Sequence, residues 1–165
     1  MQNAIEIQVF VSCPKDVNAE KSIVESVCTT LNSTAISIGC EIRFQLRDWS
    51  EIVGQFGENP QRIINNTISG YDIYIGIWWM RFGTKTGNIN KNTGKEYESG
   101  TFEEFSIAYE NWKSFNLPKL FVFFKDPIKP NLENVLEQLK RVQKLKEQLK
   151  HFGWVILLPK IRTTG

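Results

Sequence analysis

The sequence is poor in the side chains on which many enzymes depend. It has one histidine, His151, and three cysteines, Cys13, Cys28 and Cys40, with no CxxC pair. A lone histidine excludes most Ser-His-Asp arrangements, and it is also the only base that a Cys13 nucleophile would have. The odd cysteine count and the spacing argue against a disulfide framework and a metal site. We therefore expect no metal and no histidine-dependent catalysis.

The chain also lacks an excess of charge of one sign and any long apolar run. Its 20 basic and 18 acidic residues leave a net charge of +2, so we expect no nucleic-acid partner. The apolar runs are far shorter than the ~18 residues of a membrane span. The first ten residues alternate like a strand and do not resemble a secretory signal. These absences predict a soluble, cytoplasmic protein with no membrane partner.

Apolar periodicity predicts five strands that alternate with helices. The expected strands are 5–11, 40–46, 71–79, 119–124 and 154–158, and the expected helices are 15–38, 60–69, 101–113 and 131–150. Strand 40–46 alternates as an edge strand does, whereas the last three strands are apolar almost throughout, which suits burial on both faces of a parallel sheet. We expect the basic residues of the last helix, Lys146 among them, to lie on a solvated face.

This pattern predicts one α/β domain over residues 1–165, a three-layer flavodoxin-like fold with a five-stranded parallel sheet of order 2-1-3-4-5. Such a unit normally has a helix after its last strand, so we expect the chain to be the N-terminal part of a longer multidomain protein. Ligands of these sheets bind beyond the carboxyl ends of the strands, near the switch point between the first and third. From that rule we expect a ligand to bind among the loops 12–16, 47–59 and 80–100.

Two adjacent carboxylates, Glu103 and Glu104, stand where the helix after the third strand begins. One interpretation is a capping box, with Thr101 as N-cap and Glu104 reaching back to its amide, while Glu103 favours the helix dipole. The other interpretation is catalytic. An ionised carboxylate at the mouth of the crevice would stabilise the oxocarbenium-like transition state of N-glycosidic cleavage. Nicotinamide leaves its riboside as a neutral molecule, so one carboxylate would suffice.

Several segments, in this order, resemble a TIR-like domain of the branch found at the N-termini of NTPase-containing signalling and defence proteins. The resemblance runs from residue 5 to about residue 127 and is carried by VFVS at 9–12, SCPKD at 12–16, YDIYIG at 71–76, RFG at 81–83 and EFSIA at 104–108. In members of this family that cleave NAD, the glutamate matching Glu104 is catalytic. The run SGTFEE at 99–104 also resembles the SGTxxE of nucleoside deoxyribosyltransferases, which act on N-glycosidic bonds too.

The resemblance implies an NAD glycohydrolase of antiviral cell-suicide signalling, with Glu104 as catalytic residue and NAD as substrate. Partners would be other TIR domains and fused sensor or NTPase domains. Expected substrate-binding residues are Ser12, Cys13 and Lys15 on the phosphate or ribose side, Trp49, Trp78 and Arg81 on the base side, and Thr101 at the helix start. Because Trp78 and Trp79 are adjacent on a strand, we expect at least one in the core.

Two alternatives stay open from the sequence. Many TIR domains are assembly modules without activity, so the chain could be a non-catalytic interaction domain in which Glu104 only caps a helix. The second alternative is a nucleoside or nucleotide N-glycosidase or deoxyribosyltransferase, which keeps Glu104 catalytic and changes the substrate.

Overall fold

The apolar runs form a parallel sheet, as the sequence predicts. The computed structural model describes residues 4–47, 70–126, 133–150, 152 and 155–157. In it, β1 (Ile5–Ser12), β2 (Ile42–Arg47), β3 (Ile73–Trp78) and β4 (Lys119–Phe124) pair in parallel in the order β2-β1-β3-β4. A three-residue strand, β5 (Val155–Leu157), lies parallel to β4. The α/β class and the order of the first four strands are confirmed.

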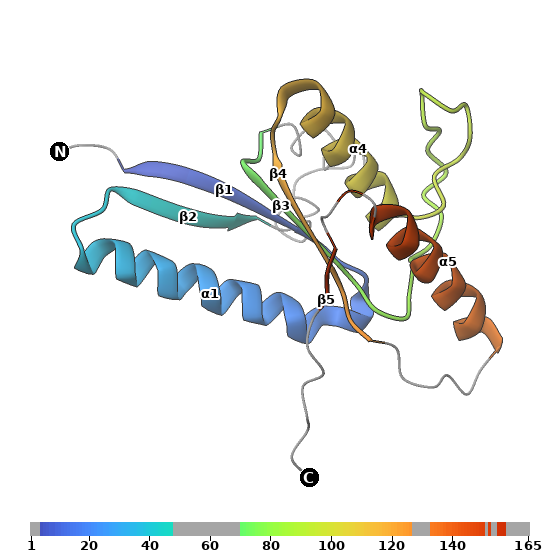
Figure 1. Ribbon diagram of the computed structural model, residues 1–165, viewed down its shortest axis with the longest axis horizontal. Helices are drawn as coiled ribbons and strands as arrows, with labels where there is room; N and C mark the ends of the chain where they lie inside the picture. Colours follow the sequence, from blue (N-terminus) through green and yellow to red (C-terminus); the bar gives the residue numbers. More distant parts are fainter. Residues whose placement is uncertain (1–3, 48–69, 127–132, 151, 153–154, 158–165) are drawn as a thin grey trace, which may run out of the picture.

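Helices cover both faces of this sheet (Figure 1). After β1 the chain forms a short 3-10 helix, η1 (Lys15–Val17), and then α1 (Asn18–Ser37), which lies on one side. On the other side lie α4 (Gly100–Phe115), between β3 and β4, and α5 (Glu133–Lys150), between β4 and β5. The predicted helix 60–69 falls outside the described residues.

Alternate residues of the strands enter two separate apolar cores. Toward α4 and α5 the sheet buries mainly aromatic side chains, among them Phe10, Tyr74, Trp78 and Phe124. Toward α1 it buries a smaller cluster centred on Val11, Val17 and Ile77. Since neighbouring strand residues point to opposite faces, a sheet covered on both sides needs apolar residues at nearly every position. That requirement explains the unbroken apolar runs in the sequence.

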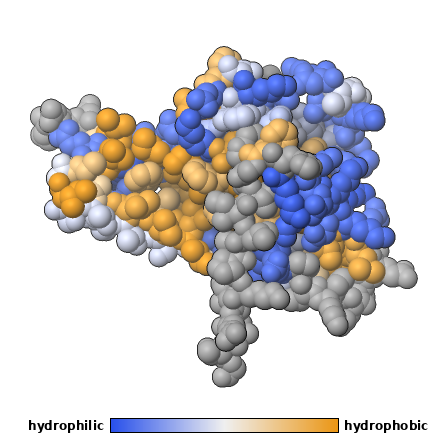
Figure 2. Space-filling view, in the orientation of Figure 1, coloured by the Kyte–Doolittle hydropathy of each residue, from blue (hydrophilic) through white to orange (hydrophobic). Residues whose placement is uncertain are grey.

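The apolar stripe of α1 is only partly covered. Ile23, Val27 and Leu31 recur every four residues, yet their exposed fractions are 52%, 49% and 42%, while Cys28 and Ala35 are buried. In Figure 2, apolar residues gather at the end of the molecule formed by α1, β1 and β2. In the described part of the chain, no helix has the length and apolarity needed to cross a membrane.

Candidate active site

The candidate site begins where β1 ends at the carboxyl edge of the sheet. Ser12 is the last residue of β1, is almost fully buried, and lies opposite Gly76 of β3. A Cβ at position 76 would lie 2.5 Å from Cζ3 of the Trp78 ring. Glycine at this position therefore leaves room for the Trp78 indole, which packs against Phe105 and Phe124.

Helix α4 starts one residue after Ser99, not at Thr101. Ser99 is extended, and its hydroxyl accepts a hydrogen bond from the Phe102 amide at 3.1 Å. The Gly100 amide donates to the Thr84 carbonyl, and a Cβ on Gly83 would lie only 2.9 Å from that of Ser99. The predicted capping box of Thr101 and Glu104 is therefore wrong. The close contact with residues 83 and 84 selects Ser99 as N-cap, and Glu104 falls in the second turn.

Glu104 reaches back to the sheet instead of capping its own helix. The Ser12 hydroxyl donates to Oε2 of Glu104 at 2.6 Å, a short charge-assisted bond between residues 92 apart in the sequence. Both side chains are buried, with 7% of Glu104 and 1% of Ser12 exposed. Burial and, secondarily, the Glu104 carboxylate raise the pKa of the neighbouring Tyr74 well above its ordinary value. The carboxylate therefore lies in a fixed, mostly dry position.

Cys13 lies next to this pair, in surroundings that favour the protonated thiol. Burial raises the pKa of its thiol to about 11, and the carboxylates of Glu104, Asp16 and Glu20 add to this, against a lowering effect of Lys21. Because the thiolate is the reactive form, the Cys13 thiol is inert near neutral pH. The same set of charges shows that Cys13 lies near both Glu104 and the first turns after β1.

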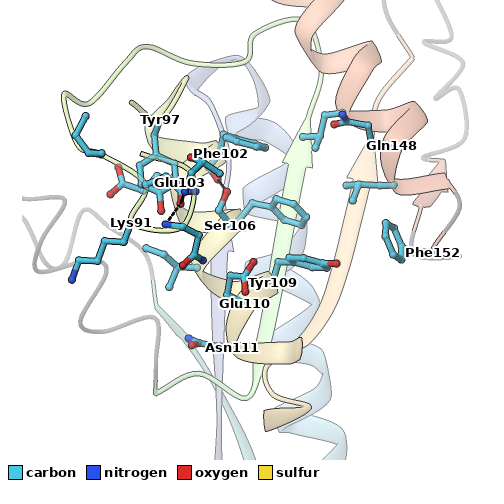
Figure 3. A pocket seen from close by; sticks show the side chains of 18 residues that line it. Lys91, Tyr97, Phe102, Glu103, Ser106, Tyr109, Glu110, Asn111, Gln148 and Phe152 are labelled. Carbon is cyan, nitrogen blue, oxygen red and sulfur yellow. Dashed lines mark hydrogen bonds between the residues drawn. The ribbon is translucent and has the colours of Figure 1, made fainter. Parts of the chain in front are cut away.

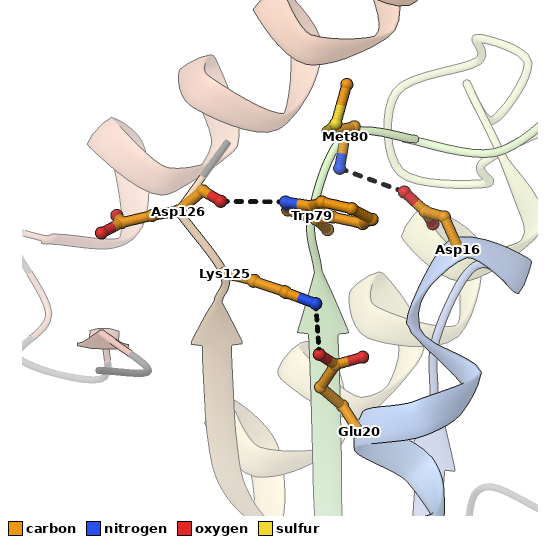
Figure 4. A network of polar contacts seen from close by, with 6 residues as sticks. All are labelled: Asp16, Glu20, Trp79, Met80, Lys125 and Asp126. Carbon is orange, nitrogen blue, oxygen red and sulfur yellow. Dashed lines mark hydrogen bonds and ion pairs between the residues drawn. The ribbon is translucent and has the colours of Figure 1, made fainter. Parts of the chain in front are cut away.

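Asp16 connects those turns to the loop that follows β3. Its Oδ2 atom accepts hydrogen bonds from the amides of Met80, at 3.1 Å, and Arg81, at 3.0 Å. Figure 4 shows the first of these bonds, together with an ion pair between Glu20 and Lys125 at 2.6 Å. No local pattern in the sequence predicts these contacts of Asp16, because its partners lie more than 60 residues away. Asp16 and Glu20 together hold the start of α1 against the ends of β3 and β4.

Glu103 points away from Glu104 and holds the polar loop. Its carboxylate is almost fully buried and accepts hydrogen bonds from Thr86 Oγ1, at 2.7 Å, and Asn88 Nδ2, at 3.0 Å. Residues 84–98 fold back on themselves, with a single antiparallel bridge between Ile89 and Glu96. Glu103 therefore anchors this loop, and the two adjacent glutamates have different structural roles.

The loop, α4 and α5 together line an open cavity of about 640 Å³ (Figure 3). Glu103 forms part of its wall, with aromatic side chains from three segments, Tyr97, Phe102, Tyr109 and Phe152. Neither Ser12 nor Glu104 lines it. The cavity is thus distinct from the candidate active site.

The structure brings some of the predicted site residues together and separates others. Ser12, Cys13 and Glu104 share one site, and Lys15 is the first residue of η1, which Asp16 joins to the turn at Arg81. Trp78 is fully buried against Phe105 and Phe124, so the expectation of a core tryptophan is confirmed and the predicted contact of Trp78 with a base is wrong. Thr101 is half-buried at the start of α4, and Trp49 lies outside the described residues.

Among the described residues, no three His, Cys, Asp or Glu side chains are grouped so that they could hold a metal ion. No protein-family model matches the chain, and a search of curated proteins finds no significant match.

Proposed function

We propose that this chain is a TIR-like domain that hydrolyses the N-glycosidic bond of NAD to nicotinamide and an ADP-ribose product. The hydrogen bond from Ser12 to Glu104 carries the proposal, because it fixes one buried carboxylate at the carboxyl edge of the sheet between β1 and β3. That edge is where parallel α/β sheets bind their ligands. On this proposal the fold is the three-layer flavodoxin-like type with order 2-1-3-4-5, and the short β5 is its fifth strand.

The chemistry needs little more than this carboxylate. As the bond between the ribose and the positively charged ring lengthens, the ring takes the bonding electron pair and leaves as neutral nicotinamide. Positive charge develops on the ribose, and an ionised Glu104 stabilises it more strongly in a mostly dry site than in water. Water then adds to the anomeric carbon and loses a proton. No step requires a histidine or an activated cysteine.

Assembly and biology follow from the resemblance to TIR-like domains. We propose that the domain associates with copies of itself and acts within a longer protein whose fused domains sense infection, as an effector of antiviral cell suicide. The non-catalytic alternative gives the Ser12–Glu104 bond a purely structural role, as a tie between β1 and α4. The glycosidase or transferase alternative gains support from Ser99 and Gly100, which start α4 in the SGTxxE segment.

The test is nicotinamide release from NAD by concentrated or artificially clustered protein. Glu104→Gln keeps the size of the side chain and its ability to accept from Ser12, but removes the charge. We expect it to lower kcat by about 100-fold or more, as the loss of a group that stabilises the transition state does. Glu103→Gln is the matched control, since it makes the same change one residue away on the loop side of α4, and it should retain activity within several-fold.

Equal losses in the two variants would contradict a catalytic role for Glu104. If clustered wild-type protein releases no nicotinamide, hydrolysis of NAD is wrong for this domain. Release of a base from nucleosides in a substrate panel, with the same dependence on Glu104, would then favour the glycosidase or transferase alternative.

A further inference from the structure

The turn after β3 is held by side chains from both faces of the sheet. Asp16, from the α1 side, accepts from the Met80 and Arg81 amides, and Gln138 of α5 accepts from the Phe82 amide at 2.9 Å. The Phe82 side chain is buried and packs on Phe102, with ring centroids 5.4 Å apart. Three successive amides are therefore fixed in a loop, where backbone amides are more often left to water.

The residue at the centre of this turn carries an exposed cation. No ion pair or hydrogen bond joins the Arg81 guanidinium or the Lys15 ammonium to another group among the described residues. Lys15 precedes Asp16, the residue that binds the Arg81 amide. The two cations thus lie in η1 and in the turn after β3, which the Asp16 carboxylate joins.

The carboxylate of Asp16 repels an anion near Lys15 and Arg81 less than its full charge would. Its Oδ2 is occupied by two amides, and its Oδ1 is buried. The carboxylate therefore faces the protein, and the cations of Lys15 and Arg81 are the charges exposed to solvent. An arginine on a fixed backbone suits phosphate, because its planar guanidinium donates two parallel hydrogen bonds to the oxygens.

The carboxyl edge of the sheet then carries charges of opposite sign. Glu104 is buried beside Ser12 at the end of β1, while Lys15 lies in η1 after β1 and Arg81 lies in the turn after β3. Cys13 lies between them, next to Ser12 in the chain and within electrostatic range of both Glu104 and Asp16. This arrangement is complementary to a ligand with a cationic ring at one end and anionic phosphates at the other.

We propose that Arg81, with Lys15, binds the phosphate groups of a diphosphate-bearing nucleotide, and that Asp16 and Gln138 are the positioning residues that hold Arg81 in place. This inference rests on the proposed function and assigns named residues to the phosphates of its substrate, which the free nucleosides of the glycosidase alternative lack. It also moves Arg81 from the base side, where the sequence placed it, to the phosphate side.

The test is calorimetric binding of ADP-ribose and of adenosine, which lacks the phosphates. Arg81→Gln should weaken ADP-ribose binding by about 10- to 100-fold, the usual effect of removing a hydrogen-bonding charge. Its effect on adenosine should be negligible. Arg43→Gln is the matched control: it removes the same charge from an exposed position on β2 that pairs with Glu6, near the opposite end of the sheet, and should leave both affinities unchanged.

The positioning role of Asp16 has its own comparison. Asp16→Asn keeps an oxygen that accepts from the Met80 and Arg81 amides, so it should bind ADP-ribose almost as wild type does. Asp16→Ala should reproduce the defect of Arg81→Gln. Because Asp16→Ala also loosens α1, its fold is checked by circular dichroism, and Arg81→Gln, which alters an exposed side chain, remains the deciding variant.

The outcomes separate this inference from the proposed hydrolysis. ADP-ribose binding that Arg81→Gln leaves unchanged overturns the phosphate assignment, whether or not NAD is cleaved. Binding that requires Arg81 without nicotinamide release supports the assignment and contradicts hydrolysis. If wild-type protein neither binds ADP-ribose nor shows a KM for NAD that Arg81→Gln raises, the inference is wrong.

Discussion

Cys13 has a thiol pKa that depends on the charges around the candidate site. Its thiol has a pKa raised to about 11 by burial, with added effects of Glu104, Asp16 and Glu20. We expect iodoacetamide to modify Cys13 in the folded protein more slowly than in the urea-unfolded chain, where a thiol titrates near ~8.5. Peptide mass spectrometry of samples labelled at increasing pH measures this difference, which should vanish as the pH approaches about 11.

The raised pKa of Cys13 also makes the stability of the folded protein depend on pH. A thiol whose pKa is higher in the folded state stabilises that state below the unfolded pKa, and the contribution is lost as pH rises through the folded value. For the labelling experiment, Glu104→Gln is the control variant. Removing that carboxylate should allow Cys13 to react with iodoacetamide at a lower pH than in wild type. Faster labelling of native than of unfolded Cys13 would contradict the burial of the thiol.

At the scale of single residues, the sequence could identify Glu104 but not what it contacts. The glutamate follows from its place at a helix start that opens on the crevice, whereas its hydrogen bond to Ser12 depends on the pairing of β1 with β3 and on the tilt of α4. Trp78 was assigned to the base from its position at the end of the third strand. Alternation placed Trp78 and Trp79 on opposite faces but could not tell which of them packs under α4.

The start of α4 supplies a prediction for a whole element. Ser99→Ala removes the side-chain acceptor of the Phe102 amide and should lower the free energy of unfolding by about 1 kcal/mol, the usual loss for a helix N-cap. Thr101→Ala, two residues further on, is the matched control and should change it by only a few tenths. Urea denaturation measures both. A loss in Thr101→Ala equal to that in Ser99→Ala would restore the capping box that the sequence predicts.

Elements were easier to predict than the faces they bury. The bounds of β4 match the prediction, and α4 and α5 start or end within two residues of it, because apolar runs and helical spacing are local signals. Which face of an element is buried depends on the other elements that pack against it. Lys146 was expected on a solvated face, yet it is only 9% exposed and its ammonium lies 6.0 Å from the Phe124 ring centroid. A long side chain can cover an aromatic ring in this way while its charge remains near water.

For the whole molecule, the sheet order was predictable and the joining of its loops was not. The alternating pattern of β2 places it at an edge, and the order of β1, β3 and β4 beside it follows from the flavodoxin-like fold class. No pattern links Asp16 to the turn at Met80, or Glu103 to Thr86 and Asn88, because these are contacts between loops and helix starts. Polar contacts of this kind become visible only once the elements are placed.

Self-association is the property that the molecule as a whole should show if it works as a TIR-like domain. Ile23, Val27 and Leu31, on one side of α1, expose about half of their surface. Exposed apolar patches mark association surfaces, since contact between copies would remove them from water. We therefore expect sedimentation velocity to show larger species as the protein concentration rises, and nicotinamide release per molecule to rise with them.

Two variants separate assembly from catalysis in that experiment. Val27→Glu places a charge in the apolar stripe and should keep the protein monomeric with low activity per molecule, and artificial clustering should restore the activity. Glu104→Gln should associate as wild type does and stay inactive even when clustered. Activity per molecule that stays constant while the protein passes from monomer to oligomer would mean that one chain suffices for the chemistry, and that contacts between copies do not control it.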